Sequence, residues 1–127
     1  MLERGVPIDG VGLQMHLSLD NPPKPEDVAA NISRLNKLGL EVQITELDVK
    51  IHGNPSRSQV KEQARIYAEL LKICLKAKRC SAFIMWGFTD AHSSVADLSD
   101  GYDSALIFNK QYRPKPAYRS LDGVLRN

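Results

Sequence analysis

The segment Glu41-Val-Gln-Ile-Thr-Glu-Leu-Asp48 predicts a β-strand and, together with its neighbours, decides the fold class. Before it, apolar residues recur at helical spacing from Pro25 to Gly39, where the proline suits a helix start and the glycine a stop. After it, a second periodic stretch, capped by Ser56 or Ser58, predicts a helix to about Lys78.

Three further segments extend this alternation of strands and helices. Ile8–Gln14 and Ser81–Gly87 predict strands, and Pro116–Leu125 predicts a closing helix that Gly123 weakens. Ser81–Gly87 is apolar throughout, so we expect both of its faces to be covered. Thr89–Arg113 is expected to be a long loop. The order βαβαβα indicates a parallel sheet with right-handed crossovers.

The spacing of the strands favours part of a (β/α)8 TIM barrel. The strands begin at Ile8, Glu41 and Ala82, which are 33 and 41 residues apart. Eight units at that spacing need roughly 300 residues, as such barrels do, whereas 127 residues hold only three units. We therefore expect a fragment of a larger α/β domain. The alternative is a free-standing three-strand unit with two open sheet edges.

Composition excludes several classes of partner. Seventeen Lys and Arg against 15 Asp and Glu give a net charge of +2. This balance does not indicate binding to nucleic acid or to an anionic membrane. Apolar runs are short, as at Ala82–Trp86, so no membrane-spanning helix is expected. Met1–Gly5 has no apolar core, and we expect the tail of a helix there rather than a secretion signal.

Polar side chains gather where the predicted strands end. Gln14 and His16 share one strand face, as do Glu46 and Asp48, and Trp86 ends the third strand. Because ligand sites of parallel α/β sheets lie at the carboxyl ends of the strands, these side chains are expected at one mouth.

Such a cluster suits carbohydrate hydrolysis. A carboxylate attacks or stabilises an oxocarbenium-like centre, a histidine orients it, and an indole offers an apolar face to a sugar. The alternatives remain open at this point: Glu46 and His16 also fit a structural ion pair, and Trp86 also fits a core position.

Four segments carry a family resemblance, and they occur in family order: Ile8-Asp-Gly-Val-Gly-Leu-Gln-Met-His-Leu-Ser18, Val42-Gln-Ile-Thr-Glu-Leu-Asp-Val49, Ile84-Met-Trp-Gly-Phe-Thr-Asp90 and Arg113-Pro-Lys-Pro-Ala-Tyr118. Together they closely resemble glycoside hydrolase family 10, the retaining endo-β-1,4-xylanases. The resemblance implies that residues 1–127 are the C-terminal part of the catalytic barrel, strands six to eight. It also implies an extracellular enzyme without a cofactor, acting on xylan or xylo-oligosaccharides once the N-terminal part of the barrel is present.

The resemblance also implies individual roles. Glu46 lies where the family has its catalytic nucleophile, and His16 lies where the family has a histidine hydrogen-bonded to it. Asp48 would be the second partner of His16. Gln14 would line the pocket for the sugar that becomes covalently attached, and Trp86 would form part of its floor.

The resemblance also implies a disulfide, and the sequence departs from the family pattern in two respects. Cys74 and Cys80 match a disulfide found in many members. The family usually has a second tryptophan eight residues after the first, and that position here is Ser94. The family's general acid/base glutamate belongs to strand four, which precedes Met1 in this alignment. We therefore expect the isolated chain to be inactive.

Other titratable residues have plainer interpretations. Asp90, Asp97, Asp100 and Asp103 are expected in a solvated loop, and their spacing does not match an EF-hand, so no metal is assigned. His52 and His92 are expected to be isolated surface residues. Two alternatives to the xylanase stay open: a non-catalytic remnant with at most weak xylan binding, and a related barrel hydrolase acting on another β-linked glycan.

Overall fold

A parallel sheet forms the centre of the protein in a computed structural model that describes all 127 residues. β3 (Glu41–His52) is the central strand. β1 (Gly10–Leu13) and β2 (His16–Ser18) follow one another along it, and β4 (Cys80–Met85) pairs with it as well. All three pairings are parallel, so the predicted parallel sheet is confirmed.

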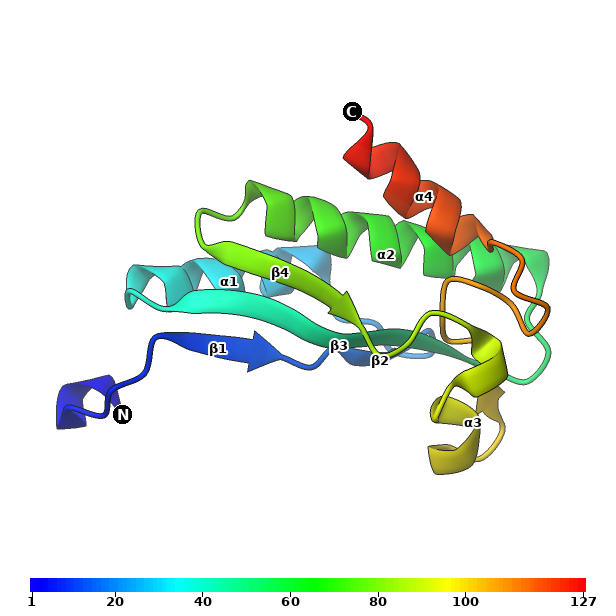
Figure 1. Cartoon of the computed structure of the whole chain (residues 1–127), viewed down its shortest axis with the longest axis horizontal. Helices are drawn as coiled ribbons and strands as arrows, with labels where there is room; N and C mark the ends of the chain where they lie inside the picture. The colour runs from blue at the N-terminus through cyan, green and yellow to red at the C-terminus, as the bar shows by residue number, and fades with distance from the viewer.

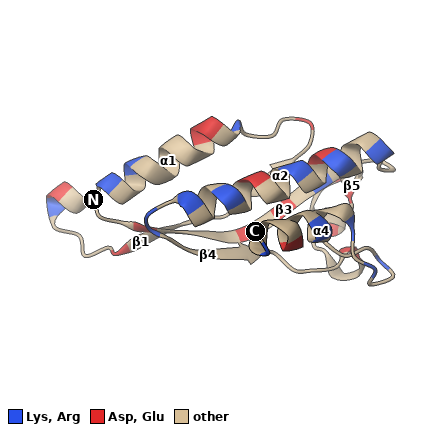
Figure 2. Cartoon of the chain, turned by 90° about the horizontal axis from the view of Figure 1, so that it is seen from above, with Lys and Arg blue, Asp and Glu red and all other residues tan.

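Three helices cover one face of this sheet (Figure 1). They are α1 (Pro25–Lys37), α2 (Arg57–Lys76) and α4 (Pro116–Leu125). The main core lies between these helices and β3, and its best-buried members are apolar. Charged residues are spread along α1 and α2 (Figure 2). Buried residues between these helices and the sheet include Ile32, Val42, Ile44, Leu47, Val49, Tyr67 and Leu70.

The other face of the sheet carries no helix within this chain. Ile84 on β4 is 48% exposed, and burial along β4 alternates between half-buried and exposed residues. The expectation that Ser81–Gly87 is covered on both faces is therefore wrong for these 127 residues. β4 pairs only with β3, and all three long helices lie on the opposite side.

Helix ends follow the sequence signals closely. The Ser56 hydroxyl accepts the Gln59 amide, and the Gln59 side chain accepts the Ser56 amide, which makes a capping box at the start of α2. This settles the alternative between Ser56 and Ser58 in favour of Ser56. α2 ends at Lys76, two residues before the predicted end, and α4 continues through Gly123. At the N-terminus, a 3₁₀ turn over Leu2–Arg4 takes the place of the expected helix tail.

β3 contains one more residue than either neighbour at its centre. Leu13 lies opposite Ile44 and His16 opposite Asp48, so two residues of the first strand path face three of β3. On the other side, the register shifts between Ile44 and Leu47 in the same way. This is the geometry of a β-bulge, which inserts a residue and re-aims a side chain. The extra residue of β3 falls at Thr45–Glu46.

The strand path opposite this bulge breaks at Met15. Met15 has φ 65°, a left-handed conformation that a methionine rarely adopts. The predicted strand Ile8–Gln14 is accordingly two shorter strands, with Gln14 and Met15 between them. The side chains from Gln14 to His16 therefore do not alternate between two sheet faces as in a regular strand, because the positive φ of Met15 changes the direction of the chain locally.

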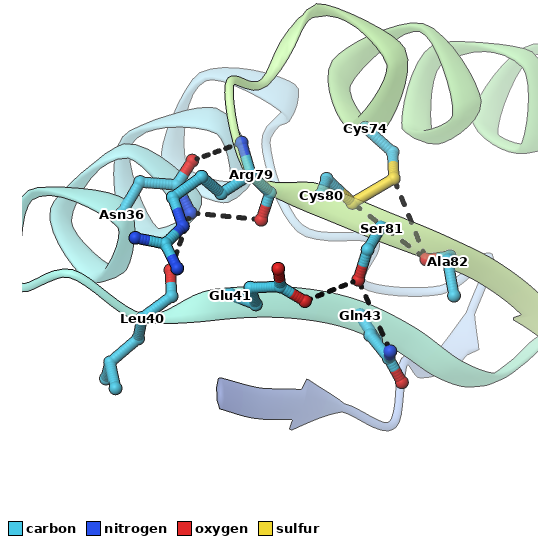
Figure 3. The surroundings of a disulfide bond; sticks show 9 residues. All are labelled: Asn36, Leu40, Glu41, Gln43, Cys74, Arg79, Cys80, Ser81 and Ala82. Carbon is cyan, nitrogen blue, oxygen red and sulfur yellow. Dashed lines mark hydrogen bonds between the residues drawn. A yellow bond between two sulfur atoms is a disulfide. The ribbon is translucent and has the colours of Figure 1, made fainter. Parts of the chain in front are cut away.

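A disulfide joins the end of α2 to the start of β4 (Figure 3). Cys74 and Cys80 are bonded, with Cα atoms 5.2 Å apart. Next to the disulfide, the Asn36 side chain accepts the Arg79 amide and donates to the carbonyls of Leu40 and Arg79. These contacts join α1, α2 and the first residues of β3 and β4 at the end of the sheet where the strands begin.

The long segment after β4 is more ordered than a loop. It contains a 3₁₀ turn at Asp90–His92, a short helix α3 (Val95–Leu98) and a two-residue strand β5 (Tyr102–Asp103) that pairs antiparallel with β3. α2 holds this segment through side chains, because Gln63 donates to the carbonyls of Val49 and Ser104 and the Tyr67 hydroxyl donates to Ala105.

Asp90 is not a solvated loop residue, which corrects the sequence-based expectation. It is buried, accepts the Leu106 amide at 2.8 Å and pairs with the Lys115 ammonium at 2.8 Å. Lys115 also donates to the Ser104 carbonyl, although burial lowers its pKa. The separation of 25 positions between the two partners hid this pair from the sequence pattern. His52 and His92 are exposed but not isolated, since they contact Tyr102 and Tyr112 respectively.

We predict that Lys115→Met loosens this segment. The substitution leaves the Asp90 carboxylate buried without its cation, a change that costs roughly 3–5 kcal/mol in buried pairs. Amide hydrogen exchange should show faster exchange at Leu106, whose N–H donates to Asp90. Lys110→Met is the matched control, because its pair with Asp103 lies at the surface. Unchanged exchange at Leu106 in the Lys115 variant would contradict the prediction.

Candidate active site

His16, the first residue of β2, joins two carboxylates in the middle of β3, next to the ends of β1 and β4. Its Nδ1 lies 2.7 Å from Asp48 Oδ2, and its Nε2 lies 3.1 Å from Glu46 Oε2. The exposed fractions of the side chains are 41% for His16, 24% for Glu46 and 3% for Asp48. Glu46 is therefore open to a ligand, whereas Asp48 lies behind the imidazole. A protonated imidazole donates to both carboxylates at once.

The backbone fixes this arrangement through the bulge in β3. The Glu46 amide donates to the Gln14 carbonyl, and the Asp48 amide donates to the Met15 carbonyl. The break at Met15 and the inserted residue of β3 thus face each other. In a strand without the inserted residue, only the regular alternation of side chains would bring Glu46 and Asp48 toward the same imidazole.

The pKa values of His16 and Asp48 are both raised, for different reasons. Burial by itself lowers the pKa of His16, but its hydrogen bonds to Asp48 and Glu46 outweigh burial and raise the pKa above 6.5. Burial raises the pKa of Asp48 above 3.8, against the lowering effect of His16. A cationic imidazole between the two carboxylates agrees with the contacts of 2.7 and 3.1 Å and with the raised pKa of His16.

Trp86 and Gln14 border the same mouth. The Trp86 amide donates to the Leu47 carbonyl directly beyond β4, and the indole meets the His16 ring edge-on at 6.0 Å. Trp86 is 48% exposed, so one side of the indole is free for an apolar ligand face. Gln14 is exposed, and its side chain makes no hydrogen bond within the chain. The structure thus gathers His16, Glu46, Asp48 and Trp86, with Gln14 at the rim.

Lys50 is a neighbour of this cluster that sequence reasoning missed. It lies two residues after Asp48, and its ammonium donates to the Ser99 hydroxyl at 2.9 Å and sits 4.6 Å above the Tyr102 ring. The Tyr102 hydroxyl donates to Asp20. The available signal was the continued i, i+2 spacing from Glu46 through Asp48 to Lys50. The partner residues on the segment after β4 gave no signal.

Cation ligands and membrane spans are not features of these residues. No group of three or more His, Cys, Asp or Glu side chains lies close enough together to hold a metal ion. None of the helices combines the length and the apolar character that crossing a membrane requires.

Comparison with known proteins gives the family. The model of glycosyl hydrolase family 10 matches residues 1–123. The chain belongs to glycoside hydrolase family 10. The resemblance noted from the four sequence segments is therefore confirmed.

Individual relatives support this membership. The family 10 chain is 42% identical over 123 residues to endo-1,4-beta-xylanase B of Thermotoga neapolitana, which covers 94% of this chain and 34% of that protein. It is 40% identical to endo-1,4-beta-xylanase B of Neocallimastix patriciarum over 98% of this chain and 13% of that protein. The crystal structure of Thermotoga petrophila xylanase 10B in complex with xylobiose matches with a TM-score of 0.92, at 40% identity, over 98% of this chain and 38% of that one.

This family 10 chain spans about a third of the length of the Thermotoga relatives that it matches. The matched structures are (β/α)8 barrels, and the three βα units seen here correspond to the C-terminal part of such a barrel. The prediction of a partial TIM barrel from strand spacing is confirmed. The exposed sheet face carrying Ile84 is the face that points into a barrel interior.

We predict that the raised pKa of His16 depends on Asp48. NMR titration of the imidazole should give a pKa above 6.5, and Asp48→Asn should lower it, because an amide supplies no negative charge. The stability that His16 contributes is present below about pH 6.5 and is lost as pH rises through its folded-state pKa.

The titration is best made on a completed barrel, in which residues 1–127 follow the N-terminal part of Thermotoga petrophila xylanase 10B. Asp97→Asn, in the first turn of α3, is the control that should leave the pKa of His16 unchanged. An equal pKa in the Asp48 and Asp97 variants would refute the pairing.

Proposed function

We propose that this chain supplies the nucleophile half of a retaining endo-β-1,4-xylanase. The observation that carries the proposal is the contact of one imidazole with both Glu46 and Asp48 at the end of a family 10 sheet. Relatives named endo-1,4-beta-xylanase and a structure with bound xylobiose support the substrate class. Residues 1–127 would then be the C-terminal part of a catalytic barrel.

In this mechanism Glu46 attacks the anomeric carbon of the sugar. The bond between that carbon and the leaving oxygen breaks, and a glycosyl ester forms on the Glu46 carboxylate. His16 holds Glu46 through Nε2, while Asp48 holds His16 through Nδ1. As Glu46 loses its charge in the ester, it also loses its attraction for the imidazolium. Asp48 then keeps the ring in place until water releases the sugar.

The second carboxyl group must come from the rest of the barrel. Retaining enzymes need two carboxyl groups about 5–5.5 Å apart, one of which protonates the leaving oxygen and later activates water. Asp48 is buried and bonded to His16, and Asp90 is buried and paired with Lys115. Asp103 is paired with Lys110 and bonded to the Ser104 amide. None of these acids is free to take that role beside Glu46.

Trp86 and Gln14 would contact the sugar that Glu46 attacks. The free side of the half-exposed indole suits the apolar face of a pyranose, and the unpartnered amide of Gln14 offers both a donor and an acceptor to hydroxyl groups. Extracellular localisation fits the same proposal, because the Cys74–Cys80 disulfide is of the kind that persists in oxidising compartments.

A second candidate is a barrel hydrolase acting on another β-linked glycan. An exoglucanase of Acetivibrio thermocellus is 36% identical over 92% of this chain, so a related sequence carries a name for a different glycan. A third is a non-catalytic remnant with weak xylan binding. Rates of the completed barrel on xylan, β-glucan and mannan separate these candidates.

We predict that Glu46→Gln in the completed barrel lowers kcat by more than about 10⁴-fold, since no ester can form. A 2-fluoro-xyloside should label the peptide that contains Glu46, as seen by mass spectrometry. Glu41→Gln, at the far end of β3, is the matched control and should retain activity. Labelling of a different carboxylate would overturn the assignment of the nucleophile.

His16→Ala should slow turnover by about 10²-fold, because Glu46 loses the group that orients it. Labelling at Glu46 should still be detectable. Full rescue of this variant by a substrate with a good leaving group would show instead that His16 is the proton donor.

The isolated chain should show no measurable xylanase activity. It lacks the second carboxyl group, and its uncovered sheet face and strand edges favour self-association over a stable monomer. Adding the N-terminal part of a related barrel in trans is expected to restore activity. Hydrolysis of xylan by the purified chain, sedimenting as a monomer, is the result that would defeat this prediction.

A further inference from the structure

A small pocket opens beside His16 and Trp86, on the side toward the segment after β4. Its volume is about 260 Å³. His16, Asp48 and Trp86 form the wall shared with the candidate active site. The remaining walls come from β3 and from the residues around α3, and they are Lys50, Ser94, Val95, Leu98 and Ser99. Ser94 occupies the position where the family resemblance implies a tryptophan, so a small side chain leaves this space open.

The polar groups of this pocket are mainly donors. The Lys50 ammonium spends one hydrogen on Ser99 and keeps two others. The Ser94 hydroxyl makes no hydrogen bond within the chain, and the Ser99 hydroxyl, which accepts from Lys50, still has its own hydrogen to donate. Three residues with donors to spare therefore line a space whose other walls are His16, Asp48, an indole, a valine and a leucine.

Lys50 is the charged residue of the lining that has no ion pair. Its ammonium lies within 4 Å of no carboxylate, unlike those of Lys110 and Lys115. Asp48 is the acid of the lining, and its Oδ2 is held by His16, whose other ring nitrogen contacts Glu46. These three groups therefore pair among themselves, and the Lys50 ammonium is left for a ligand.

We propose that this pocket binds a carboxylate carried by the sugar ring at Glu46, so that the site accepts a uronic acid residue as well as a neutral sugar. The inference rests on the proposed function, because it takes Glu46 and Trp86 as the sugar site. A carboxylate has two acceptor oxygens and a negative charge, which match Lys50, Ser94 and Ser99. A neutral hydroxymethyl group would enter the pocket but would leave the ammonium unpaired.

Three methyl β-glycosides test this proposal, because they differ only at C5: the xyloside carries hydrogen, the glucoside a hydroxymethyl group and the glucuronide a carboxylate. Their dissociation constants are measured by NMR on the completed barrel. We expect the glucuronide to bind about tenfold more tightly than the glucoside, an advantage that shrinks at high salt.

Two variants locate the effect. Lys50→Met keeps the length of the side chain without its charge and should remove the tenfold advantage, with the glucoside and xyloside affected less than about twofold. Ser94→Trp should fill the pocket and weaken the glucuronide and the glucoside, with the xyloside affected least. Lys72→Met, on the exposed face of α2, is the control for loss of one positive charge.

The outcomes separate this inference from the proposed function. Equal affinity for glucoside and glucuronide, or an equal effect of Lys50→Met on all three glycosides, would overturn the carboxylate site. Hydrolysis of an aryl xyloside by the same barrel reports on the proposed function independently. Binding of the glucuronide that Lys50→Met selectively weakens supports the pocket even if that hydrolysis fails.

Discussion

The inserted residue in the middle of β3 is the constraint on which the rest of the site depends. In a regular strand, residues two apart share a face but stay roughly a pleat apart along it. Here Thr45 and Glu46 together oppose a single residue of β4, and Thr45–Leu47 oppose only two residues between β1 and β2. The local change of direction brings Glu46 and Asp48 to the two nitrogens of one imidazole. A bulge beside an active site is a recurrent device for aiming a side chain.

The strain opposite this bulge has the same origin. Met15 adopts a left-handed backbone conformation between β1 and β2, and its carbonyl receives the Asp48 amide. A non-glycine residue in that conformation costs of order 1–3 kcal/mol and persists only where its surroundings fix it. The hydrogen bonds from β3 supply that fixation. The strained turn at Met15 and the bulge in β3 therefore form one unit. This unit positions His16, the first residue of β2.

Local signals predicted the elements well, and distant contacts account for what they missed. Pro25, Gly39 and Ser56 marked helix ends because capping acts within a few residues. Period-two spacing identified Glu46 and Asp48 as a pair. Neither signal predicts the positive φ of Met15. Neither predicts the burial of Asp90, because its partner Lys115 lies far from it in the sequence. The register shift of β3 is equally invisible locally, because it is defined only by the neighbouring strands.

Within residues 1–127, the hydrogen bonds of Glu46 and His16 are made among residues 14–48. A barrel that retains this segment therefore retains these contacts when its other units vary. Recombination between related barrels at a boundary before Ile8 would thus exchange the preceding barrel units as one block. The surroundings of the sheet end could diverge in this way while the contacts among His16, Glu46 and Asp48 are inherited unchanged.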